Sequence, residues 1–114
     1  MYGKLKFPAA TTTVPAAAVL MNSRRVFVLT IFGSYSGGGA GLQADLRTCA
    51  AREVHGVCSL TVVSAQNTEE FKSALAMPPE IVLAQIEAVL ADFSVRATKT
   101  GFLYTEGNIR AIST

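Results

Sequence analysis

The stretch LTIFGSYSGGGAGLQADL, residues 29–46, joins an apolar run to a segment with helical spacing. It holds five glycines, which permit a tight turn or the close approach of another group to the main chain. The apolar run begins before it, and its β-branched and aromatic residues predict a buried strand over residues 26–32. Beyond the glycines, apolar residues recur at helical spacing, which predicts a helix over residues 40–53.

The same alternation continues toward the end of the chain. A second apolar run predicts a strand over residues 57–65, and a polar connection is expected to follow as far as Lys72. A helix is expected to open at residues 77–80, because the first helical turn tolerates proline and favours an acid. Residues 95–98 predict a third short strand, and Thr105 is expected to cap a last helix.

Strands that alternate with helices favour a parallel sheet joined by right-handed crossovers. The predicted fold class is therefore α/β, with about three strands alternating with helices. The helix that opens at residues 77–80 is expected to bury an apolar stripe, made up of Val82, Ile86, Val89, Leu90 and Phe93.

Composition separates residues 1–25 from the rest of the chain. The 114 residues are half apolar, which allows one folded domain and argues against a wholly disordered chain. No acid precedes Asp45, whereas eight acidic and six basic side chains follow from there on, so the folded part is slightly acidic and no nucleic-acid partner is expected. Residues 1–25 are predicted to be a disordered leader; an organellar targeting peptide is the other interpretation, which the two prolines disfavour.

Neither the cysteines nor the histidine indicates a metal site or a catalytic residue. Cys49 and Cys58 lack the spacing of a metal site and are interpreted as core thiols in a reducing compartment. His55 is expected to be a surface residue at a helix-to-strand turn, without an acid or nucleophile beside it. No apolar run reaches the roughly 18 residues of a membrane helix. These observations favour a cytoplasmic protein without a metal site or a membrane partner.

Three clusters of polar or glycine residues follow the three predicted strands. They are residues 33–41, 66–68 and 99–103, and the sheet would bring them to the edge where ligands bind in open parallel sheets. The glycines alone are also compatible with an ordinary flexible turn. A P-loop is excluded because Gly39 stands where its lysine belongs, and the order of a dinucleotide-binding motif is absent.

Two side chains in these surroundings have the chemistry of ligand contacts. Asp45 lies about one turn into the predicted helix, where it would serve either as a surface acid that compensates the helix dipole or as a ligand contact. Gln66 presents a donor and an acceptor on one planar group, which is what an aminopyrimidine edge requires.

With these residues assembled, the sequence resembles the hydroxymethylpyrimidine/phosphomethylpyrimidine kinases of thiamine biosynthesis, in the ribokinase-like superfamily. Four segments carry the resemblance in order, from Val28 onward: LTIFGSYSGGGAGLQADLRT, VVSAQNT, MPPEIVLAQIEAVLADFSV and KTGFL. The resemblance implies a three-layer ribokinase-like sheet and makes residues 26–114 the N-terminal part of such a kinase domain. Members transfer the γ-phosphoryl group of ATP, with Mg²⁺, to the hydroxymethyl oxygen and then to the resulting monophosphate.

The resemblance also implies four substrate-binding residues. Gln66 would hydrogen-bond the pyrimidine, Asp45 would hold its polar substituents, and Gly33 would let the ring approach the first strand. Phe102 stands where the family has methionine and would stack on the ring. Other departures are Tyr35, where an aspartate is usual, and Phe32, which replaces a small residue; both would crowd the pocket.

No catalytic residue is assigned within the chain. Family members have a later glycine-rich segment that carries a catalytic residue, with the ATP site nearby. None of the four segments quoted above corresponds to that later segment. The chain is therefore expected to be a truncated kinase that is inactive alone and binds neither ATP nor Mg²⁺ tightly. The alternative is a non-catalytic pyrimidine-binding or interaction module. A homodimer, as in the full-length family, is left open.

Overall fold

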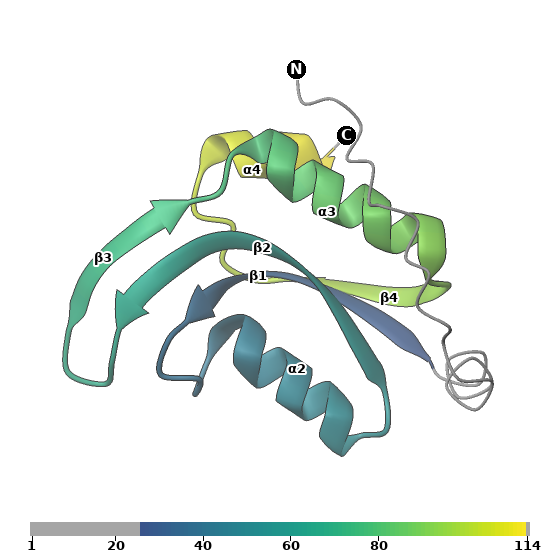
Figure 1. The fold of residues 1–114 in the computed structure, drawn as a ribbon, viewed down its shortest axis with the longest axis horizontal. Helices are drawn as coiled ribbons and strands as arrows, with labels where there is room; N and C mark the ends of the chain where they lie inside the picture. Colours follow the sequence, from purple (N-terminus) through teal and green to yellow (C-terminus); the bar gives the residue numbers. More distant parts are fainter. Residues whose placement is uncertain (1–25, 114) are drawn as a thin grey trace, which may run out of the picture.

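A mixed four-stranded sheet forms the centre of the computed structural model, which describes residues 26–113 (Figure 1). Its strand order is β3-β2-β1-β4. The strands are β1 (Phe27–Tyr35), β2 (His55–Gln66), β3 (Phe71–Ala76) and β4 (Val95–Thr100). β1 pairs in parallel with both β2 and β4, whereas β3 pairs antiparallel with β2. The predicted parallel arrangement is confirmed, and β3 adds an antiparallel strand at one edge.

Helices cover both faces of the sheet (Figure 1). Helix α2 (Gly41–Ala51) lies on one face, and α3 (Pro79–Asp92) and α4 (Glu106–Ser113) lie together on the other. Helix α4 begins where expected, because the Thr105 hydroxyl accepts a hydrogen bond from the Asn108 N–H at 3.1 Å and so caps its first turn. The three-layer α/β arrangement is confirmed.

The polar connection predicted as far as Lys72 is wrong, because β3 begins at Phe71. The turn before it is closed by Asn67, whose side-chain oxygen accepts hydrogen bonds from the N–H groups of Glu69 and Glu70, both at 2.9 Å. Such a turn brings β3 back along β2 as a hairpin. The sequence of β3, FKSALA, contains a lysine and several small residues and forms no continuous apolar run, so the strand was not predicted.

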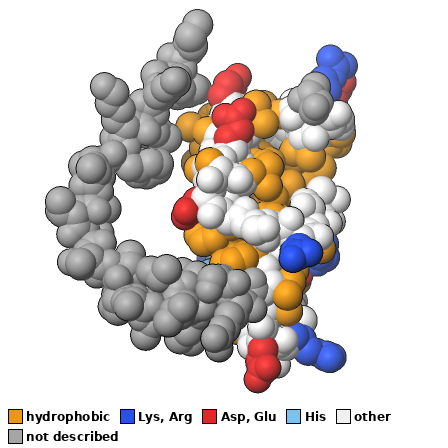
Figure 2. Space-filling model, turned by 90° about the vertical axis from the view of Figure 1, so that its right-hand side faces the viewer, with side chains coloured by type: hydrophobic (Ala, Val, Ile, Leu, Met, Phe, Trp, Pro, Cys, Tyr) orange, Lys and Arg blue, Asp and Glu red, His pale blue; other side chains and the backbone are white. Residues whose placement is uncertain are grey.

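The hydrophobic core lies on the α3/α4 side of the sheet. Phe27, Leu29 and Ile31 of β1 are buried together with Val57 of β2. Half-buried side chains from the helices and neighbouring segments pack against them, namely Ile86, Val89, Phe93, Val95, Leu103 and Ile112. The predicted stripe of α3 is thus confirmed in the main, but Leu90 is 55% exposed. It is one of several hydrophobic side chains left at the surface, and Figure 2 shows hydrophobic side chains on the face turned to the viewer.

His55 and the cysteines have structural surroundings. His55 starts β2 at the expected turn, but its ring is half-buried, 5.1 Å from the Phe27 ring and stacked at 6.2 Å on Phe93, so the surface position predicted for it is wrong. Cys49 and Cys58 are free and half-buried, and burial raises the pKa of the Cys58 thiol. The predicted leader lies outside the described residues. Among residues 26–113, no helix is long and apolar enough to cross a membrane.

Candidate functional site

The glycine loop brings the start of α2 directly against β1. Its turn is closed by a 2.9 Å hydrogen bond from the Gly38 N–H to the Tyr35 carbonyl, and Gly38 has a φ of 76°. Gly41 has a φ of 71°, and a β-carbon there would lie 2.6 Å from the Gly33 carbonyl oxygen. Only glycine meets both conditions without strain. The loop is therefore a tight strand-to-helix turn that sets the position of the first turns of α2.

Gly33 is buried at an irregularity in the pairing of β1 with β2. A β-carbon on Gly33 would lie 2.5 Å from Val62 Cγ1, so the missing side chain allows this valine of β2 to pack closely. The ligand role implied for Gly33, letting a flat ring approach β1, stays a prediction. What the structure places beside Gly33 is Val62.

Asp45 is held by side chains from two neighbouring strands. Thr30 of β1 donates a 2.6 Å hydrogen bond to Oδ2, and Lys99 Nζ of β4 donates to Oδ1 at 2.6 Å and to Oδ2 at 2.8 Å. Thr30 and Lys99 are direct partners in the pairing of β1 with β4, which explains why both reach one carboxylate. The Asp45 side chain is only 18% exposed. It is therefore a fixed carboxylate within the fold, not an exposed acid that compensates the dipole of α2.

The surroundings of Asp45 keep it ionised. Partial burial alone would raise the pKa of its carboxyl group. The hydrogen bonds from Lys99 and Thr30, together with the positive charge of Lys99, outweigh this effect and hold the pKa of Asp45 below its usual value. At neutral pH the site therefore contains a carboxylate and an ammonium group in contact.

Phe32 lies beside this ion pair. The Lys99 ammonium is 4.9 Å from the centre of the Phe32 ring, within the range of a cation–π contact. The ring occupies the space next to Gly101, where a β-carbon would overlap it. The absence of a side chain at Gly101 thus accommodates the bulk of Phe32 on this side of the sheet. Phe32 was predicted to crowd the pocket; in the structure its ring lies against Gly101 and Lys99.

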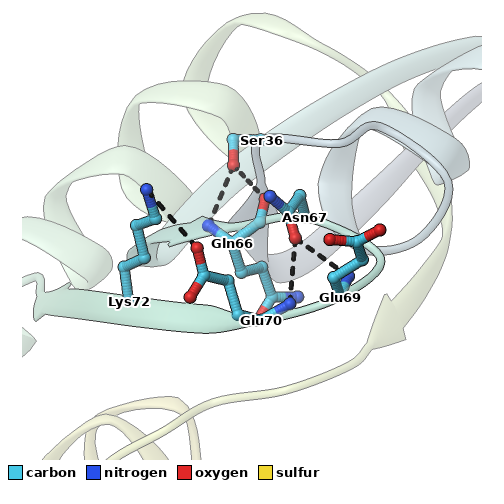
Figure 3. A network of polar contacts seen from close by, with 6 residues as sticks. All are labelled: Ser36, Gln66, Asn67, Glu69, Glu70 and Lys72. Atoms are coloured by element: carbon cyan, nitrogen blue, oxygen red, sulfur yellow. Dashed lines mark hydrogen bonds and ion pairs between the residues drawn. The ribbon is translucent and has the colours of Figure 1, made fainter.

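Gln66 ends β2 and is attached to the glycine loop through its main chain (Figure 3). The Ser36 hydroxyl donates to the Gln66 carbonyl at 2.6 Å and accepts from the Gln66 N–H at 3.1 Å. Within residues 26–113 the side-chain amide of Gln66 forms no hydrogen bond, and the residue is half-exposed. Its donor and acceptor are thus available to a ligand.

The structure does not join Gln66 and Asp45 directly, because no hydrogen bond links their two polar groups among the described residues. Gln66 ends β2, whereas Thr30, which holds Asp45, pairs with Cys58, eight residues earlier on that strand. The Asp45 carboxylate therefore lies back from the end of β2, and a contact of both side chains with one ring stays a prediction. Phe102 follows the end of β4, is 59% exposed and contacts Tyr104 edge-to-face at 5.5 Å. Tyr35 folds back on its own loop, where a β-carbon on Gly37 would lie 2.6 Å from its ring.

Three polar residues of the site were not identified from the sequence: Thr30, Lys99 and Gln43. Gln43 of α2 accepts from the Tyr35 N–H at 3.1 Å and donates to Ser34 Oγ at 2.6 Å, so it fastens the end of β1 to the helix. Lys99 was part of the third predicted cluster but had no role. The order of the strands, which local sequence does not encode, is what places it beside Asp45.

Comparison with known proteins decides the family. The model of the phosphomethylpyrimidine kinase family matches residues 36–114. The chain belongs to this family. Over 75 residues it is 56% identical to the hydroxymethylpyrimidine/phosphomethylpyrimidine kinase of Synechococcus elongatus, an alignment that covers 66% of this chain and 28% of that protein.

Solved structures of phosphomethylpyrimidine kinase and related kinases have the same fold. The phosphomethylpyrimidine kinase of Clostridium difficile superposes with a TM-score of 0.75 at 40% identity, over 77% of this chain and 38% of that one. The pyridoxal kinase of Staphylococcus aureus, in complex with AMP-PCP and pyridoxal, gives 0.69 at 32% identity, over 77% of this chain and 33% of that one. The ribokinase-like fold is confirmed, and the chain spans well under half the length of these family members and relatives.

Proposed function

We propose that this chain supplies the substrate-binding edge of an ATP-dependent kinase of 4-amino-5-hydroxymethyl-2-methylpyrimidine and its monophosphate, in thiamine diphosphate biosynthesis. The observation that carries the proposal is the Asp45 carboxylate of α2, kept ionised by Thr30 of β1 and Lys99 of β4. A site that recognises a small polar heterocycle needs such a fixed acceptor in partly buried surroundings.

Each implied substrate contact matches the chemistry of the side chain that would make it. Asp45 accepts a hydrogen bond from a polar substituent of the pyrimidine, and the free amide of Gln66 pairs with a donor and an acceptor on the ring. Phe102 offers an exposed ring face for stacking. Ser36 and Gln43 are positioning residues, since they attach Gln66 and the end of β1 to the loop.

ATP and Mg²⁺ act in the whole kinase and are not expected to bind tightly to this chain alone. Among residues 26–113, no three His, Cys, Asp or Glu side chains lie close enough together to hold a metal ion. The sequence also lacks the P-loop pattern that would cradle phosphates. We propose that the 114-residue chain binds the pyrimidine without phosphorylating it. A cytoplasmic location stays a prediction.

Calorimetry with hydroxymethylpyrimidine and the purified 114-residue chain tests the binding edge. We expect saturable binding that Asp45→Asn weakens at least tenfold, because the neutral amide forms weaker hydrogen bonds than the carboxylate. Asp92→Asn, at the exposed end of α3, is the matched control and should bind like the unchanged chain. The absence of binding would refute the proposed edge, and turnover with MgATP would refute the expected inactivity.

A chimera separates the kinase from a non-catalytic module. Residues 26–113 would replace the aligned segment of the Synechococcus elongatus kinase, whose remaining residues supply what this chain does not cover. We expect a chimera that phosphorylates hydroxymethylpyrimidine and loses most of this activity with Asp45→Asn. A folded chimera that binds the pyrimidine without turnover would favour the module.

A further inference from the structure

The hydrogen bonds of Asp45 and Lys99 leave one acceptor and one donor side by side. A carboxylate has about four lone-pair positions and an ammonium group has about three N–H donors. Among residues 26–113, Asp45 Oδ2 accepts from both Thr30 and Lys99, whereas Oδ1 accepts only from Lys99. One acceptor position therefore remains on Oδ1. Lys99 uses two donors on the carboxylate, and the Phe32 ring centre lies 4.9 Å from its Nζ. Within residues 26–113 the third N–H of the ammonium group makes no hydrogen bond, so a ligand oxygen or nitrogen can accept it.

This ion pair differs from the other two of the described residues. Lys72 with Glu70 and Arg110 with Glu106 join side chains that are all more than half exposed, as is usual for surface pairs of little energetic value. In contrast, Asp45 is 18% exposed while Lys99 is 55% exposed. The pair thus presents a fixed, mostly buried carboxylate beneath an ammonium group that a ligand can reach.

We propose that Lys99 is a further substrate-binding residue, which together with Asp45 receives the hydroxymethyl group of the pyrimidine. The hydroxyl hydrogen donates to Asp45 Oδ1, and the hydroxyl oxygen accepts from Lys99 Nζ. A hydroxyl group is both a donor and an acceptor on one atom, so it satisfies the two free positions at once. The inference rests on the proposed function and deepens it, since it names the substrate group and adds a residue.

A binding cycle with two ligands tests the role of Lys99. Hydroxymethylpyrimidine and its 4-amino-2,5-dimethyl analogue, which lacks only the hydroxyl, are titrated into the 114-residue chain and into Lys99→Met. We expect the missing hydroxyl to weaken binding to the unchanged chain about tenfold, and to change binding to Lys99→Met about twofold at most. Arg110→Met, which removes a paired cation from α4, should retain the tenfold difference.

The outcomes distinguish this inference from the proposed function. An equal effect of the hydroxyl in both chains overturns the role of Lys99 while leaving the binding edge intact. Binding of neither ligand to the unchanged chain overturns both. If Lys99→Met does not fold, the ammonium resonance of Lys99 in the unchanged chain decides: it should shift with the alcohol but not with the dimethyl analogue. If the chain associates, all titrations are made in a Leu75→Lys background, since Leu75 is 67% exposed on β3.

Discussion

The two faces of β1 differ in what they contribute. On the α3/α4 side, Phe27, Leu29 and Ile31 are buried in an apolar core. On the α2 side, Thr30 is equally buried, but its hydroxyl donates a hydrogen bond to Asp45, which also contacts Lys99. Successive side chains of a strand point to opposite faces of the sheet. Some residues of β1 therefore pack in the core, whereas their neighbours face the candidate site. Substitutions on the two faces should therefore separate stability from binding.

The largest effect is expected on the apolar face. Leu29 is 2% exposed, and Leu29→Ala should lower the free energy of unfolding by about 2–5 kcal/mol, through lost burial and the cavity left behind. Urea unfolding followed by circular dichroism measures this loss. Leu29→Met, which keeps most of the volume, is the control and should lose less than about 1.5 kcal/mol. A loss below 1 kcal/mol for Leu29→Ala would contradict the assignment of this face as the core.

The second-largest effect on stability is expected in the glycine turn that joins β1 to α2. Gly41→Ala should cost about 1–3 kcal/mol, because alanine resists the positive φ and its β-carbon would press on the Gly33 carbonyl. Gly39→Ala is the matched control, since the nearest atom to its β-carbon would be 3.9 Å away. Equal stability of the two variants in urea unfolding would show that the turn tolerates side chains at both positions.

Local patterns allowed most of the fold to be predicted. The apolar runs of β1 and β2, the proline start of α3 and the Thr105 cap all depend on residues close together in sequence. The β3 strand was missed because its pairing with β2, not its own composition, stabilises it.

The candidate site was predictable only in part. Asp45 and Gln66 lie in motifs that could be read from the sequence, and their substrate roles stay predictions. The contact of Asp45 with Lys99 joins residues 54 positions apart and requires β1 to lie between β2 and β4. Nothing in a local window states that order, so Lys99 and Thr30 could be recognised only once the sheet was assembled.

On the polar face, a substitution should lower stability less than one on the apolar face, but it should change the pKa of Asp45. Thr30→Val keeps the shape of the side chain but removes the hydrogen bond to Oδ2, which should lower the free energy of unfolding by about 1 kcal/mol. The pKa of Asp45 should rise, because one of the interactions that stabilise its charged form is gone. Carboxyl-carbon NMR titration measures this pKa, and Thr30→Ser, which keeps the hydroxyl, should leave it nearly unchanged. A loss as large as that of Leu29→Ala would mean that both faces serve the core.

The smallest effect is expected in the dependence of stability on pH. Since the folded state lowers the pKa of Asp45, its ionised form contributes stability at pH values above its unfolded pKa of about 3.9. This contribution is lost as the pH falls through the lower, folded pKa, so stability between about pH 5 and 2 should fall more steeply in the unchanged chain than in Asp45→Asn. Urea unfolding across this range measures the two slopes, with Asp92→Asn as the control for removing one carboxyl group. Parallel slopes for the chain and Asp45→Asn would show that the ion pair with Lys99 has no thermodynamic link to folding, and the polar face of β1 would then serve binding alone.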